Sequence, residues 1–144
     1  MATFLGNTVG LKVGTTDLSA WVNSITINQE FDTVEVTAMG NSGHVLLAGL
    51  ENSTISIEFN ADFAASAVNQ TINGTAAGNG LVGSTASLTI LPVKGTAVSA
   101  SNPLYTATVL VTQWPQAFSV GELATVSVTW PVNDKITKAI TGTF

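Results

Sequence analysis

Thr54-Ile55-Ser56-Ile57-Glu58-Phe59-Asn60 is the stretch that decides the fold class of this chain. Its apolar residues stand at every second position, and polar residues stand between them. A period of two is that of a β-strand with one face in a core and the other in solvent. The sequence therefore predicts a half-buried strand here, of the kind that antiparallel sheets contain.

The same alternation recurs three times downstream, in stretches rich in Val and Thr that suit strands. The residues expected to point inward there are Ala86, Leu88 and Ile90, then Tyr105, Ala107, Val109 and Val111, then Ala124, Val126, Val128 and Trp130. Shorter strands are expected at Val9–Val13, Ser24–Asn28 and Thr33–Ala38. The last two are separated by the acidic segment 29–32.

Two segments have helical character. Asp17–Val22 reads as one capped turn, with Asp17 accepting from free backbone N–H groups. Asp62–Ile72 is the helix candidate, with Asp62 as N-cap. Its shared face would hold Phe63, Ala67, Val68 and Ile72. We predict a mainly β chain, an antiparallel β-sandwich or flattened barrel with one short packed α-helix, as a single domain over residues 1–144.

The strand pattern lapses between Gly40 and Asn52, which we interpret as a long glycine-hinged loop. Its apolar centre is Val45, Leu46 and Leu47, flanked by His44 and Leu50. Such side chains either fold back onto their own core or dock onto a neighbour. Sparse surface charge favours docking, so we predict an intersubunit loop at residues 40–52.

Charge is scarce along the whole chain. Only 9% of the residues are charged, there is no arginine, and the net charge is −5. A weakly charged surface is cheap to desolvate, which suits a subunit of an assembly. Four scattered lysines cannot form a basic stripe, so tight nucleic-acid binding is not expected. No apolar run reaches the length of a membrane helix, so we expect no membrane partner.

Residues that could support catalysis or metal binding are few. His44 is the only histidine and there is no cysteine, so zinc-site and catalytic-triad interpretations fail. Glu30, Asp32 and Glu35 are the only close acidic cluster. They could form a calcium loop or a carboxylate pair, although solvated or lumen-facing charge fits better. We therefore expect no enzyme activity, no metal site and no cofactor.

The three tryptophans leave a carbohydrate-binding platform open as an alternative. Trp130 lies on the inward side of its strand, so core packing is favoured for it. Trp114 stands before a proline at a strand end and is the better candidate for an exposed aromatic residue.

Two stretches carry a family resemblance: Asp17-Leu18-Ser19-Ala20-Trp21-Val22-Asn23-Ser24-Ile25-Thr26-Ile27 and Phe31-Asp32-Thr33-Val34-Glu35-Val36-Thr37-Ala38-Met39-Gly40. Together they resemble the opening of the tail tube proteins of long-tailed phages. The C-terminal part, from Asn102-Pro103-Leu104-Tyr105 through Val120–Trp130, is similar to the closing hairpin of that family.

This resemblance implies a β-sandwich that assembles with copies of itself into stacked hexameric rings, as the conduit for phage DNA. It implies an N-terminal arm at residues 1–8, and a lumen that DNA passes without tight binding. Glu30, Asp32 and Glu35 become candidate lumen-facing acids. Other virion proteins would contact the tube ends, and the protein would be made in the host cytoplasm and act in the virion. A capsid-decorating or head–tail connector protein of the same fold is the alternative. A carbohydrate- or receptor-binding β-sandwich is a more distant one.

Overall fold

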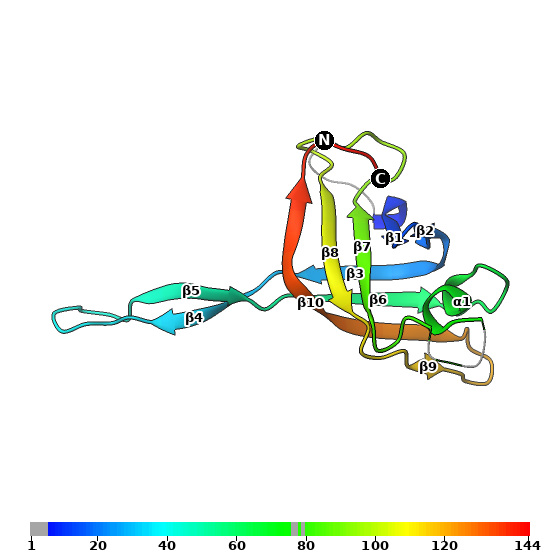
Figure 1. Ribbon diagram of the computed structural model, residues 1–144, viewed down its shortest axis with the longest axis horizontal. Coiled ribbons are helices and arrows are strands. Elements are labelled where there is room, and N and C mark those ends of the chain that lie inside the picture. Colours follow the sequence, from blue (N-terminus) through cyan, green and yellow to red (C-terminus); the bar gives the residue numbers. More distant parts are fainter. Residues whose placement is uncertain (1–5, 76–77, 79) are drawn as a thin grey trace.

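The C-terminal strand β10 (Thr125–Ala139) organises the sheet. Its first half, up to Pro131, pairs antiparallel with β6 (Thr54–Asn60). Its second half, from Val132, pairs with β8 (Leu104–Leu110). The register shifts between Asn133 and Thr137, where Asp134 has a φ of 72°. The strand bends along its length and so belongs to both halves of a curled sheet (Figure 1).

The computed structural model describes residues 6–75, 78 and 80–144. The sheet runs in the order β2-β1-β7-β8-β10-β6-β3, and β9 also pairs with β10. The remaining strands of this sheet are β1 (Gly10–Val13), β2 (Thr16–Asp17), β3 (Val22–Asn28), β7 (Thr85–Leu91) and β9 (Gln116–Ala117). Its curl makes a half-barrel, which confirms the predicted antiparallel sandwich or flattened barrel.

The core lies on the concave side of this sheet, where the two halves face each other. Phe59, Val109 and Trp130 are completely buried there. The Trp130 Nε1–H donates to the Gln113 carbonyl at 3.0 Å, so burying the indole leaves no polar atom unpaired. The alternation in these strands therefore predicted the core side correctly.

Trp114 is not the exposed aromatic residue that its position suggested. It is half-buried, with its ring centroid 5.6 Å from that of Phe59 and 6.5 Å from that of Trp130. The chain after β8 turns back under the sheet, and this turn brings Trp114 against the core. A flat, solvent-facing sugar platform cannot be built on this ring.

The helix is shorter than predicted. Helix α1 spans Val68–Asn73, and Ala67, Val68 and Ile72 are buried as expected. Phe63 is 55% exposed, contrary to prediction. Ser66 has a φ of 62°, a left-handed conformation that a helix cannot run through. Asp62 consequently caps the turn at Ala64, at 2.9 Å, and not the helix. No helix within the described residues is long and apolar enough to cross a membrane.

The predicted capped turn is the 3-10 turn η2 (Ser19–Trp21), and a second 3-10 turn, η1 (Gly6–Thr8), forms within the predicted N-terminal arm. Asp17 Oδ1 accepts from the Ser19 N–H at 3.0 Å, as the capped-turn interpretation required. The Thr8 carbonyl accepts from the Lys94 N–H at 2.7 Å, which ties η1 to the sheet. The rest of the predicted N-terminal arm, residues 1–5, lies outside the described residues.

The second half of the predicted loop at residues 40–52 contains a strand, Leu46–Glu51. Strands β4 (Phe31–Glu35) and β5 (Leu46–Glu51) form a separate antiparallel hairpin. It extends away from the rest of the molecule along the longest axis (Figure 1). We call residues 29–53 the hairpin and the remaining described residues the body.

Candidate functional site

One face of the hairpin carries an apolar stripe. Val34 pairs with Leu47, and the same register brings Val36 opposite Val45, where the Val36 N–H donates to the Val45 carbonyl at 2.8 Å. Because side chains alternate along a strand, all four point to the same face. They are 40–58% exposed. We call Val34, Val36, Val45 and Leu47 the hairpin stripe.

The opposite face of the hairpin is also uncovered. Leu46 lies across from Glu35 and is 56% exposed, and Leu50 is 83% exposed. An isolated two-stranded hairpin in water is marginally stable, and exposed apolar patches mark interaction sites. These residues are the ones that the sequence singled out as a docking segment, although they lie on a strand and not in a loop.

The base of the hairpin is fastened to the body by polar contacts. Glu51 Oε2 accepts from the Ile136 N–H at 2.7 Å, and Glu51 Oε1 accepts from the Gln29 amide at 3.1 Å. These donors hold the pKa of Glu51 below its usual value. The buried Ser53 adds a second link, because its carbonyl accepts from Val132 and its hydroxyl from the Glu30 N–H. The base thus fixes the direction in which the hairpin points.

His44 lies beside Glu35 near the far end of the hairpin. His44 Nδ1 contacts the Glu35 carboxylate, and Thr37 donates to the same oxygen at 3.0 Å. The His44 contact, followed by the Thr37 hydrogen bond, lowers the pKa of Glu35. Both side chains are more than half exposed. The pair lies near the end of the hairpin and gives His44 a structural role there.

The structure spreads the three candidate acids along the first strand of the hairpin. Glu30 lies at the base, where its carbonyl accepts from the Asn52 N–H at 2.7 Å. Asp32 sits where the register shifts, opposite Gly49. A Cβ at Gly49 would lie 3.1 Å from the Asp32 carbonyl oxygen, so glycine suits this close approach. Within the described residues, no three acidic or histidine side chains gather as metal ligands.

The convex face of β3, β6 and β10 is mostly polar, and Glu58 is the one charged residue in its rows. Strand pairing lines its residues up in rows across the three strands. The rows are Ser24–Glu58–Ser127, Thr26–Ser56–Thr129 and Asn28–Thr54–Pro131. The Ser56 and Thr129 hydroxyls hydrogen-bond at 3.1 Å, and Asn23 donates to Glu58 at 3.1 Å. We call this surface the hydroxyl face.

The lysines all lie elsewhere. Lys12, Lys94, Lys135 and Lys138 are on or beside β1, β7 and the second half of β10. Lys94 is paired with Asp17 at 2.6 Å. The hydroxyl face therefore presents no cation to a passing phosphate, which is the group that protein lysines and arginines contact in nucleic acids.

A second exposed apolar surface lies next to β9 and α1. The rings of Phe63 and Phe118 are stacked, with centroids 6.4 Å apart, and both are more than half exposed. Val120 is fully exposed and Leu123 is 67% exposed. We call Phe63, Phe118, Val120 and Leu123 the distal patch. Sequence reasoning missed it, because it had assigned Phe63 to the core.

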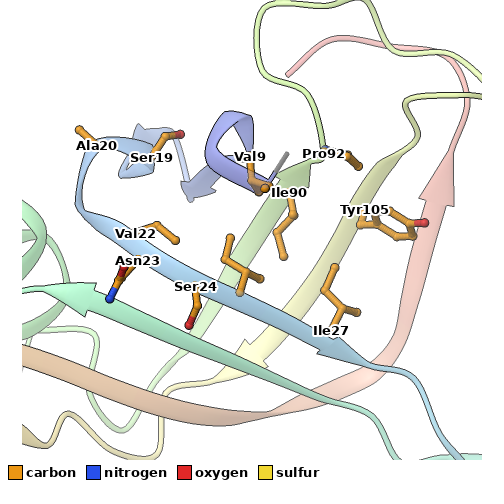
Figure 2. A pocket seen from close by; sticks show the side chains of 12 residues that line it. Val9, Ser19, Ala20, Val22, Asn23, Ser24, Ile27, Ile90, Pro92 and Tyr105 are labelled. Carbon is orange, nitrogen blue, oxygen red and sulfur yellow. The ribbon is translucent and has the colours of Figure 1, made fainter. Parts of the chain in front are cut away.

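A groove of about 820 Å³ opens where β3 faces β7 and β8, since the half-barrel does not close there. Ile27, Ile90 and Tyr105 line its apolar part, and Ser19 and Asn23 lie near the other end (Figure 2). The Ser19 hydroxyl donates a hydrogen bond to Asp17 Oδ1. The described lining residues include no histidine, carboxylate or lysine, and Tyr105 is their one titratable side chain.

No protein-family model matches the sequence, and no curated protein is significantly similar to it. Solved structures do resemble it. A chain of the native gene transfer agent (GTA) virion has a TM-score of 0.68 at 13% identity, covering 95% of this chain and 99% of that one. A chain of the SPP1 tail tube has a TM-score of 0.72 at 10% identity, covering 95% and 79%. This chain has a tail-tube fold.

A third similar structure adds the arrangement of a related assembly. It is a chain from the tail of an empty GTA particle, refined helically with C6 symmetry. Its TM-score is 0.67 at 14% identity, covering 94% of this chain and 98% of that one. The tail-tube fold thus spans both the body and the hairpin of this chain.

Proposed function

We propose that this chain is the major tail tube subunit of a long-tailed phage, which stacks as hexameric rings into a conduit for DNA. The observation that carries the proposal is the fold match over about 95% of the chain to chains of a tail tube and of a GTA virion. The C6 symmetry of the similar GTA tail supports six copies per ring. The role is structural and not enzymatic, it requires no cofactor, and it is exercised in the virion after synthesis in the host cytoplasm.

In this role the hairpin is the main contact between subunits. His44, Val45, Leu46, Leu47 and Leu50 then lie in an interface, which accounts for large apolar side chains that the monomer leaves uncovered. Burying a Leu or Val side chain contributes about 1.5–3 kcal/mol relative to leaving it exposed. Several such residues per subunit can offset the loss of freedom on association.

The hydroxyl face is the surface that best suits the lumen. Its rows of Ser, Thr and Asn offer weak, uncharged contacts, and Glu58 repels phosphate. We place Glu30 and Asp32 at its border, because they lie close in sequence to the end of β3 at Asn28. Glu35 lies farther out on β4 and would extend this acidic border toward the adjacent ring. DNA then passes without tight binding, and other virion proteins contact the tube ends.

Negative-stain microscopy of the purified protein tests the proposal. We expect long hollow tubes, or rings with six-fold symmetry at low concentration. Binding to purified capsids without tubes would instead indicate a capsid-decorating protein. Single rings bound to a portal would indicate a head–tail connector. Monomers that bind a glycan would contradict the virion role altogether. No structural observation favours that last outcome, since Trp114 packs against the core.

A further inference from the structure

The hairpin and the distal patch lie at opposite ends of the molecule. Figure 1 shows the hairpin at one end of the longest axis, with α1 and the segment following β9 at the other. The described residues therefore present two exposed apolar surfaces that one molecule cannot bring together. Exposed apolar surfaces of this kind mark interaction sites.

The two surfaces are chemically matched. The outer part of the hairpin, residues 36–45, contains no acid or lysine, and Met39 at its end is fully exposed. We call residues 36–45 the hairpin tip. Thioether groups pack favourably against aromatic rings, and the distal patch offers the stacked rings of Phe63 and Phe118. His44, the only titratable side chain of the tip, pairs with Glu35 of the same hairpin, so the tip offers a partner mainly apolar packing.

The placement of the surfaces determines the kind of assembly they produce. A contact between two different surfaces is heterologous, and it continues from copy to copy unless a rotation closes it into a ring. A contact between two identical tips would stop at a pair. Stacked rings need a heterologous contact along the tube axis.

We propose that the hairpin tip of one subunit docks on the distal patch of a subunit in the adjacent ring. This inference rests on the proposed function and names the partner surface for the hairpin. The occupant of the distal patch is a second copy of this chain, with Met39 against the pair of phenylalanine rings.

Disulfide cross-linking tests the contact directly, because the chain contains no cysteine. Met39→Cys combined with Val120→Cys introduces two thiols at fully exposed positions. A disulfide forms only when the two Cα atoms come within about 7 Å. Met39→Cys with Phe118→Cys samples a neighbouring position. Oxidation of assembled protein should give a ladder of covalent multimers for at least one pair. Each single-cysteine variant should give no covalent multimers. The matched control is Met39→Cys with Ile140→Cys, since Ile140 is 54% exposed and lies outside both surfaces.

A mixing experiment gives an independent readout. The double variant Val36→Ser/Met39→Ser removes the tip, and Phe118→Ser/Val120→Ser removes the patch. Each alone should lose tube assembly by at least about tenfold, the effect of losing a hot-spot contact. Mixed together, they should form paired rings that do not extend, because only one intact tip–patch contact remains possible.

The outcomes separate this inference from the proposed function. Tubes that form normally while neither tip–patch pair cross-links would overturn the docking contact and leave the tube role intact. A covalent dimer from Met39→Cys alone would also overturn it, because the tips would then meet each other. Failure of the unaltered protein to form any ring or tube would overturn both.

Discussion

Strand β6 of the body and the Val34–Thr37 stretch of the hairpin both alternate apolar and polar residues, yet their apolar side chains lie in opposite environments. In β6, Ile55, Ile57 and Phe59 alternate with polar residues and are at most 2% exposed. In the hairpin, Val34 and Leu47 stand in equally good strand positions and are more than half exposed. The chemistry of the side chains is the same, so the difference lies in what faces them. Apolar alternation thus indicates that a strand will be covered, and does not indicate by which chain.

The two regions should accordingly differ in where their apolar residues contribute free energy. Body residues stabilise the folded monomer. Hairpin residues contribute little until a neighbour arrives, because a two-stranded hairpin has no second layer to pack against. Substitutions can separate these contributions.

Trp130→Ala should have the largest effect on the monomer. Trp130 is fully buried at the centre of the core, and removing its indole leaves a cavity that the rigid sheet cannot refill. We expect a loss of about 3–5 kcal/mol in the free energy of unfolding, measured by urea denaturation. A loss below about 1 kcal/mol would contradict the claim that the buried residues of the body stabilise the folded monomer.

The double variant Leu46→Ser/Leu47→Ser should weaken assembly and leave the stability of the monomer nearly unchanged. Both side chains are more than half exposed, so the free energy of unfolding of the monomer should change by no more than about 0.5 kcal/mol per site. Tube formation, measured by sedimentation, should fall by about tenfold or more.

The matched control for this variant is Ala48→Ser, on the same strand and exposed, which should assemble normally. If the leucine variant instead unfolds in the monomer while its folded fraction assembles normally, the hairpin belongs energetically to the body.

Phe63→Ala and Phe59→Ala compare an exposed and a buried phenylalanine within the body. Its ring is 55% exposed and its aromatic partner is Phe118, so we expect a loss of less than about 1 kcal/mol in unfolding free energy. Phe59→Ala, the same substitution at a fully buried site, should cost about 3–5 kcal/mol. Equal losses at the two positions would show that Phe63 is buried in solution.

The smallest expected effect concerns the acid stability of the body. Burial opposes the charge of Asp17, but hydrogen bonds from Lys94 and Ser19 outweigh it and lower the pKa of Asp17 from 3.8 to about 2. A lowered pKa adds stability above pH 4, and this contribution is lost as the pH falls toward 2. Asp17→Asn should therefore flatten the pH dependence of unfolding between about pH 2 and pH 4.

Glu122→Gln serves as the control for the Asp17 measurement. Its side chain makes no hydrogen bond or ion pair with the rest of the described chain, so this variant should keep the acid-induced loss. An unchanged slope in Asp17→Asn would show that the pair with Lys94 does not persist in solution.

The sequence was most informative where one face of a strand is buried. The strands around Ile57, Leu88, Val109 and Val128 were predicted because polar and apolar residues alternate there without interruption. Strand β5 was missed because Val45, Leu46 and Leu47 are consecutive apolar residues. A strand with apolar side chains on both faces shows no alternation of polar and apolar residues. Its next residues, Ala48 and Gly49, are weak strand formers and hide the pattern further.

The helix and the distal patch were beyond sequence reasoning for a different reason. Helical spacing placed Phe63 with Ile72, but Ser66 separates them in a left-handed conformation, which a serine in the sequence does not indicate. The distal patch joins Phe63 to Phe118, and the hydroxyl face joins Thr26 to Thr129. Such surfaces depend on strand order and register between distant segments, which local patterns do not encode.

Hydrogen exchange of the hairpin amides, compared between monomer and assembled protein, tests the central claim most directly. Our account predicts rapid exchange across residues 31–51 in the monomer, because an isolated hairpin opens readily. In the assembled tube the same amides should exchange slowly, while amides of β6 and β10 are protected in both states. Equal protection of the hairpin in monomer and tube would contradict the claim that neighbouring subunits complete it.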